Sequence, residues 1–180
     1  MDIIKVLDIP KTVSSDTLPQ NILKHCNEYK EEAVKKSSHF AWLSLSKYID
    51  LTKVKFSKDG KPYILDNRKY FSLSHSFSKV AIAVSDKPIG VDIETILPSG
   101  ICAALAQRVL VGRQLQAYLK AKDREVWMTK HWVKYEAYTK LVGGKLAFSS
   151  FKEQIKGKVQ IKRIIGKDKR FYYLAVCKKI

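Results

Sequence analysis

Short apolar runs separated by turn residues fill the middle of the chain and predict β-strands. We expect these strands at residues 54–56, 70–74, 80–84 and 89–93. The segment 57–62 is dense in turn residues, and the turn at 85–88 predicts that residues 89–93 form the second arm of a hairpin. In that arm, Val91 and Ile93 are expected to face the core and to fix the register of the strand.

Three longer segments carry apolar residues at spacings of three and four, the pattern of helices that pack on a core. We expect helices at residues 30–49, 101–119 and 123–141, the last ended by Gly143. Apolar stretches at 159–161 and 171–176 flank a polar turn and predict a C-terminal hairpin. Helices mixed with antiparallel strands indicate an α+β fold, and the boundary at Leu97-Pro98-Ser99-Gly100 divides it into residues 1–97 and 98–180.

Length and composition indicate a globular protein. The 180 residues suit one domain, or two small ones packed together, and 46% of them are apolar. Cys26, Cys102 and Cys177 are far apart and odd in number, so we expect reduced core residues rather than zinc ligands or disulfides. Because no apolar run approaches the ~20 residues of a membrane span and the first residues lack a signal-peptide pattern, we expect a cytoplasmic protein with no membrane partner.

The net charge of the chain limits the classes of partner that we expect. There are 34 Lys and Arg residues against 17 Asp and Glu residues, a formal net charge of +17. Such a field favours an anion, which can be nucleic acid, anionic lipid, a polyphosphate or an acidic protein. Much of the excess lies between residues 156 and 170, where it also fits a lysine-rich edge hairpin kept soluble by its charges.

Two acids stand out in the strand Gly90-Val91-Asp92-Ile93-Glu94. Successive side chains in a strand alternate between faces, so Asp92 and Glu94 project together, roughly 7 Å apart at about 3.3 Å per residue. Such a pair is either a solvated face or half of a site for a hard cation that prefers oxygen ligands.

The helix expected at 123–141 carries Trp132, Glu136 and Lys140 on one face. One interpretation is an ordinary ion pair of Glu136 with Lys140 beside a core Trp132. The other is that Glu136 supplies a third carboxylate to the cation and that Lys140 meets a phosphate or a leaving group. Three acids and a lysine suit Mg²⁺, which usually shares its ligands with substrate phosphates.

A third group of polar side chains precedes this strand. Ser74 and His75 are neighbours, so their side chains point apart and a Ser–His catalytic pair is not expected. A hydroxyl, an imidazole and the turn-mounted Lys61, which is followed by Pro62, could instead donate to phosphate oxygens. A structural role for His75 is the alternative.

In this order the motifs resemble those of one family, the 4′-phosphopantetheinyl transferases. The similar segments are the Gly-Lys-Pro turn at 60–62, the Ser-His-Ser strand end at 74–76, the acidic strand at 90–94 and the helix segment 132–140. The resemblance spans residues 60–146, and the length points to the surfactin-synthetase-activator (Sfp-like, pseudo-dimeric) type. For that type we expect two similar α+β halves about a pseudo-two-fold axis, with the active site at their interface.

The resemblance implies Mg²⁺-dependent transfer of 4′-phosphopantetheine from coenzyme A to a serine of an acidic acyl or peptidyl carrier protein, with Mn²⁺ as an alternative metal. Adenosine 3′,5′-bisphosphate would be released, and we expect the protein to be a monomer. The implied roles are metal binding by Asp92, Glu94 and Glu136, coenzyme A binding by Lys61, Pro62, Ser74, His75, Asp92 and Lys140, and catalysis by Glu136 as general base and Lys140 at the leaving group.

Two of the departures from the family pattern concern positions near the expected site. Tyr135 stands where a lysine normally precedes the helix glutamate, and Lys134 cannot replace it because one residue is about 100° around a helix. The N-terminal arginines that often hold the 3′-phosphate are absent, which leaves Lys35, Lys36 or His39 as candidates.

Two other functions remain open. A Mg²⁺-dependent nuclease also uses acids and a lysine, although the usual acid-x-lysine arrangement fails at this strand. A non-catalytic RNA-binding protein would need exposed aromatic residues among its basic ones, which the segment 171–173 allows. With the resemblance in place, a carrier protein is a more expected partner than nucleic acid.

Overall fold

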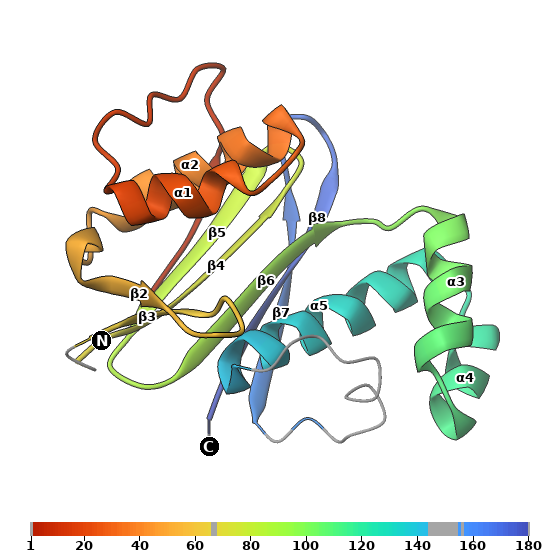
Figure 1. Ribbon diagram of the computed structural model, residues 1–180. Helices are drawn as coiled ribbons and strands as arrows, with labels where there is room; N and C mark the ends of the chain where they lie inside the picture. Colours follow the sequence, from red (N-terminus) through yellow and green to blue (C-terminus); the bar gives the residue numbers. More distant parts are fainter. Residues whose placement is uncertain (1, 66–67, 144–154, 156, 180) are drawn as a thin grey trace.

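The computed structural model describes residues 2–65, 68–143, 155 and 157–179, and Figure 1 shows the arrangement of the chain. The elements up to the end of the expected first half are β1 (Ile3–Asp8), α1 (Gln20–Asn27), α2 (Glu32–Leu45), a 3₁₀ turn (Leu51–Lys53), β2 (Val54–Phe56), β3 (Pro62–Ile64), β4 (Tyr70–Ser76), β5 (Lys79–Ser85) and β6 (Ile89–Thr95). They are followed by α3 (Ser99–Val109), α4 (Gly112–Leu119), α5 (Arg124–Val142), β7 (Lys158–Ile165) and β8 (Phe171–Lys178). The α+β fold is therefore confirmed.

The described strands form two three-stranded antiparallel sheets, in the orders β1-β5-β4 and β6-β8-β7, and a separate β2-β3 hairpin. The expected hairpin of residues 80–84 with residues 89–93 is wrong. β5 pairs with β1 along one edge and with β4 along the other, so it has no edge left for β6. β6 instead pairs with β8, with Asp92 opposite Ala175, and the predicted C-terminal hairpin of β7 with β8 is confirmed.

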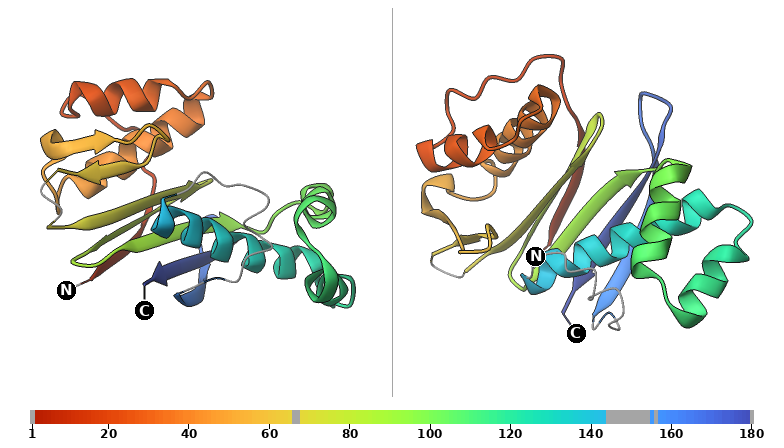
Figure 2. Two further views of the ribbon diagram at one scale, coloured as in Figure 1. Left: turned by 60° about the horizontal axis from the view of Figure 1, so that its bottom comes forward. Right: turned by 45° about the vertical axis from the view of Figure 1, so that its right-hand side comes forward.

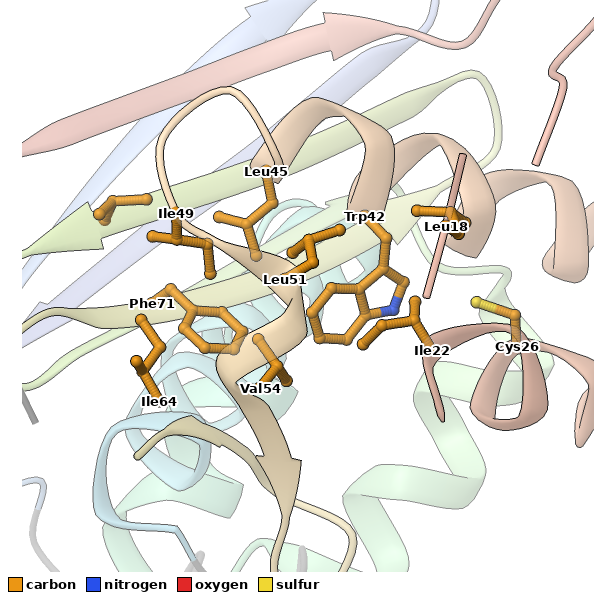
Figure 3. Close-up of a cluster of buried hydrophobic side chains, with 11 residues drawn as sticks. Leu18, Ile22, Cys26, Trp42, Leu45, Ile49, Leu51, Val54, Ile64 and Phe71 are labelled. Atoms are coloured by element: carbon orange, nitrogen blue, oxygen red, sulfur yellow. The ribbon is translucent and has the colours of Figure 1, made fainter. Parts of the chain in front are cut away.

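Helices α1 and α2 cover one face of the first sheet, where α2 packs on β4 and β5 (Figure 1). A cluster of buried apolar side chains fills the space between them. Figure 3 shows the indole of Trp42 at the centre of this cluster, with Ile22 of α1 and Leu51 and Val54 close by. β1 and α1 have no counterpart among the elements that the sequence predicted.

Helix α5 lies across β6 and β8, and α3 and α4 pack at the end of the molecule farthest from α1 (Figure 2). Asp123 caps the start of α5, since its Oδ1 accepts a hydrogen bond from the Val126 N–H, and Gly143 ends it in the left-handed conformation with φ 85°. The helix expected at 101–119 is in fact two helices. The break follows from the extended backbone of Leu110 and Val111 and from Gly112, whose φ is +51°.

Gly90 sets the distance between β6 and α5. A Cβ atom at this position would lie 1.9 Å from the carbonyl oxygen of Ala137 and 2.6 Å from the backbone nitrogen of Leu141. Only a glycine therefore lets the helix backbone approach the strand this closely. The approach brings the acidic strand next to the helix turn that carries Glu136 and Lys140.

Cys26, Cys102 and Cys177 are buried and free, as predicted. Within the described ranges, no helix is both long enough and apolar enough to cross a membrane.

Candidate active site

A cleft of about 410 Å³ opens between α1, α2 and the β2–β3 turn on one side and β4, β6 and α5 on the other. All the residues to which the four motifs assigned a site role line this cleft: Lys61, Pro62, Ser74, His75, Asp92, Glu94, Glu136 and Lys140. They come from four segments that are separate in sequence. The structure thus brings the predicted residues together, and their contacts limit what each can do.

Lys140 joins the helix to the strand at the centre of the cleft. Its Nζ lies 2.7 Å from Asp92 Oδ1 and 3.9 Å from Glu136 Oε2. Burial opposes the charge of Lys140, but Asp92 and Glu136 outweigh it and raise the pKa of the ammonium above its usual range. Lys140 is therefore a fixed positive charge in the cleft at neutral pH.

Glu94 and Glu136 are held in an environment that favours their neutral forms. Burial, followed by the charge of Asp92, raises the pKa of Glu94 to about 7. The same two causes raise the pKa of Glu136 to about 7, against the opposing effect of Lys140. The three acids beside Lys140 outnumber its one positive charge, so a cation placed among them would relieve their mutual repulsion.

The three carboxylates meet some of the requirements of a divalent cation site and not others. Among the described residues, no group of three His, Cys, Asp or Glu side chains is placed so that it could hold a metal ion. The ammonium of Lys140 instead contacts Asp92 Oδ1. However, Asp92 Oδ2 is buried and has no hydrogen-bond partner, and all three acids face the same cleft. Their donor chemistry therefore fits Mg²⁺, which takes carboxylate oxygens.

Ser74 and His75 lie on β4 beside this acidic group. The Ser74 hydroxyl donates to Asp92 Oδ1 at 2.6 Å, so its proton is directed at the carboxylate rather than into open space. Burial, followed by the charge of Lys140, lowers the pKa of His75, and Asp92 opposes the shift. His75 is thus a neutral imidazole in the cleft, able to donate one N–H.

Lys61 reaches across the cleft from the β2–β3 turn. Its Nζ donates to the carbonyl oxygen of Leu141 at 3.1 Å, in the last turn of α5, where a cation compensates the helix dipole. Burial lowers its pKa. The contact spans 80 residues of sequence and ties the glycine–lysine–proline turn to the helix that carries Glu136 and Lys140.

The aromatic wall of the cleft was missed by the sequence analysis. His25 stacks on Phe56 with ring centroids 4.5 Å apart, and Tyr29 meets the ring of His75 edge-on at 6.3 Å. His25, Tyr29 and Trp42 all line the cleft. Tyr29 lies beyond the end of α1 at Asn27, so no helical spacing in the sequence could have marked it as a neighbour of His25 in the cleft.

Several residues considered for the site lie elsewhere. Tyr135 is buried in the cluster between α5 and the two preceding helices, and Trp132 packs against the same cluster. Of the candidates for a 3′-phosphate, Lys35 bonds to Glu32 and Lys36 to the carbonyl oxygen of Lys11. Neither they nor His39 are among the residues that line the cleft.

Comparison with known proteins adds an independent observation. No family model matches the sequence. The chain is 37% identical over 98 residues to a curated protein, the 4′-phosphopantetheinyl transferase psf-1 of Bacillus pumilus. Over this stretch the chain is similar to a phosphopantetheinyl transferase. The matched stretch covers 52% of this chain and 41% of psf-1, so the chain spans less than half the length of this relative.

Proposed function

We propose that this protein transfers 4′-phosphopantetheine from coenzyme A to a serine hydroxyl of an acidic acyl or peptidyl carrier protein. The observation that carries the proposal is the contact of Lys140 with Asp92 at 2.7 Å. These residues belong to two different motifs of the resemblance, 48 residues apart, and they meet in one cleft. The similarity to psf-1, which is named a transferase of this kind, supports the same activity.

Coenzyme A would lie in the cleft, with its phosphates near Lys61, His75 and Lys140 and with Pro62 and the Ser74–Asp92 pair alongside. The two lysines and the imidazole provide N–H donors on different sides of the cleft. Mg²⁺, or Mn²⁺ in its place, would be held by Asp92, Glu94 and Glu136 and would offset charge on the pyrophosphate.

The transfer itself needs a base and a group that stabilises the leaving anion. Glu136 accepts the proton of the carrier serine as its oxygen attacks the phosphorus that bears the pantetheine arm. The bond from this phosphorus to the bridging oxygen breaks, and adenosine 3′,5′-bisphosphate leaves with the bond's electron pair. Lys140, already charged and held beside Glu136, stabilises or protonates this anion.

The net charge of +17 fits an acidic macromolecular substrate. A basic protein attracts an acidic partner over several ångströms and so raises the association rate. The same charge would suit nucleic acid, but Tyr172 and Tyr173 are buried in the sheet, and the Phe171 ring faces Arg163 at 5.1 Å. The aromatic residues of this hairpin are therefore largely explained by its packing.

One incubation tests the proposal against its rivals. The purified protein is mixed with coenzyme A, Mg²⁺ and an apo-carrier protein, and a parallel sample receives a labelled oligonucleotide. We expect the carrier mass to rise by one phosphopantetheine group. An unmodified carrier together with a cleaved oligonucleotide would favour the nuclease, and a shifted but intact oligonucleotide would favour an RNA-binding protein.

A further inference from the structure

The two sheets meet along β4 and β6, and the contact between these strands is made by side chains. β4 is the last strand of the first sheet, and β6 is the first strand of the second. Each therefore has one edge that no described strand pairs with, and the two strands pack against one another. The free N–H groups of such an edge need hydrogen-bond partners from elsewhere.

Three serine hydroxyls of β4 supply these partners. Ser72 Oγ accepts a hydrogen bond from the Val91 N–H at 3.0 Å. Two residues further along each strand, Ser74 Oγ accepts from the Ile93 N–H at 3.3 Å. The series ends where the Ser76 Oγ accepts from the Thr95 N–H at 3.2 Å. We call Ser72, Ser74 and Ser76 the serine seam.

The hydroxyl groups of the serine seam differ in whether they also donate a hydrogen bond to a carboxylate. A hydroxyl can accept one hydrogen bond and donate another at the same time. Ser74 donates to Asp92 Oδ1 at 2.6 Å, and Ser76 donates to Glu94 Oε2 at 2.8 Å. Each of these acids stands one residue before the backbone N–H that binds the same serine. For Ser72 the corresponding residue is Gly90, which has no side chain.

We propose that the serine seam positions the two acids of β6. Ser74 and Ser76 each hold the strand by its backbone and the carboxylate by one oxygen, so the side chain cannot turn independently of the strand. At Asp92, Ser74 and Lys140 both contact Oδ1, and Oδ2 is left buried without a partner among the described residues. Hydrogen bonds of this kind orient ligands and tune the affinity of a metal site.

This inference rests on the proposed function in one respect, which is that Asp92 and Glu94 bind the metal. Ser72 provides an internal control for this role. Its hydroxyl holds β6 at Val91, as the other two hold it further along, and the position opposite it carries no carboxylate. Removing Ser72 loosens the strand, whereas removing Ser74 or Ser76 also frees an acid.

The test uses the full chain with Ser72→Ala, Ser74→Ala, Ser76→Ala and Ser76→Thr. Binding of Mn²⁺ is measured from the electron paramagnetic resonance signal of the free ion, and folding is measured by urea denaturation. All three alanine variants should unfold at lower urea than the wild type. Only Ser74→Ala and Ser76→Ala should lose about tenfold or more in Mn²⁺ affinity, and Ser76→Thr, which keeps the hydroxyl, should recover most of it.

The outcomes separate the inference from the proposed function. Wild-type protein that binds Mn²⁺ and modifies a carrier, with no weaker binding in Ser74→Ala or Ser76→Ala, overturns the positioning role alone. An equal loss of Mn²⁺ affinity in Ser72→Ala also overturns the positioning role, because the loss would then come from a general loosening of β6. Wild-type protein that binds no Mn²⁺ overturns the metal site and the positioning role together. If Ser74→Ala does not fold, the comparison of Ser76→Ala with Ser76→Thr decides.

Discussion

Lys140 of α5 and Asp92 of β6 form an ion pair of 2.7 Å across the junction between helix and strand. The Asp92 side chain is 2% exposed and that of Lys140 is 30% exposed. A ligand can therefore reach this ion pair at Lys140 but not at Asp92. Removing one partner of a buried pair leaves an uncompensated charge, which costs more than the pair itself contributes. Substitutions at this site should therefore keep the shape of the side chain.

The first prediction concerns the acids. Asp92→Asn and Glu136→Gln should each lower transfer by about 100-fold or more, because each removes a charge directed at the reacting groups. Transfer is measured as the mass gain of a carrier protein, and urea denaturation confirms that the variants fold. Asp86→Asn, at an exposed site paired with Lys69, is the control and should retain wild-type activity. Wild-type rates in Asp92→Asn or Glu136→Gln would refute the assignment.

The second prediction concerns the contact of β6 with α5. Gly90→Ala should destabilise the protein by about 3 kcal/mol, because the atoms that the new methyl group meets are backbone atoms that cannot turn away. Gly100→Ala in α3 is the matched control, since a Cβ atom there meets nothing within 4 Å. Its free energy of unfolding should rise by up to about 1 kcal/mol. Similar values for the two variants, measured in urea, would contradict this account.

The third prediction concerns Lys61. Its ammonium contacts the carbonyl oxygen of Leu141 and also faces the proposed phosphate region. Lys61→Met should lower stability by about 0.5–1 kcal/mol through loss of the charge at the helix end. It should also raise the KM for coenzyme A with little change in kcat, as expected for lost ground-state binding. Lys58→Met, in the exposed part of the same turn, should change neither quantity. An unchanged KM in Lys61→Met would exclude the phosphate contact.

The fourth prediction concerns ionic strength. If the +17 charge steers an acidic carrier protein, added salt should raise the KM for the carrier while kcat stays nearly constant. The relevant comparison is between about 0.1 M and 1 M salt, where the Debye length falls from about 10 Å to about 3 Å. A carrier KM that does not depend on salt would argue against steering.

The sequence predicted those elements whose pattern is long or strongly alternating. Helix α5 and strands β4, β5 and β6 were found within a few residues of their bounds, because each carries a regular apolar pattern. Helix α1 was missed because it is only eight residues long, and a helix this short depends on tertiary packing, although its buried Ile22 and Cys26 stand four residues apart. The pairing of β6 was predicted wrongly because a turn sequence shows that the chain reverses, whereas the choice of partner depends on which edges other strands leave free.

The site shows the same division between local and long-range information. The motifs indicated the residues that line the cleft, because each chemical group sits in a short segment of recognisable sequence. They did not indicate that Lys140 contacts Asp92 or that Ser74 donates to the same oxygen, because these choices join segments 48 and 18 residues apart. Partners at such separations are decided by the packed fold rather than by local sequence.

The position of β6 has a consequence for how the chain can be divided. It precedes the boundary that the sequence predicted at 97–100, yet its backbone ladder is with β8, which follows that boundary. A polypeptide cut at this boundary would carry Asp92 and Glu94 on one piece and Glu136 and Lys140 on the other. Rejoining the two pieces would require β6 to pair with β8 again, so recovery of the proposed transfer would report that pairing.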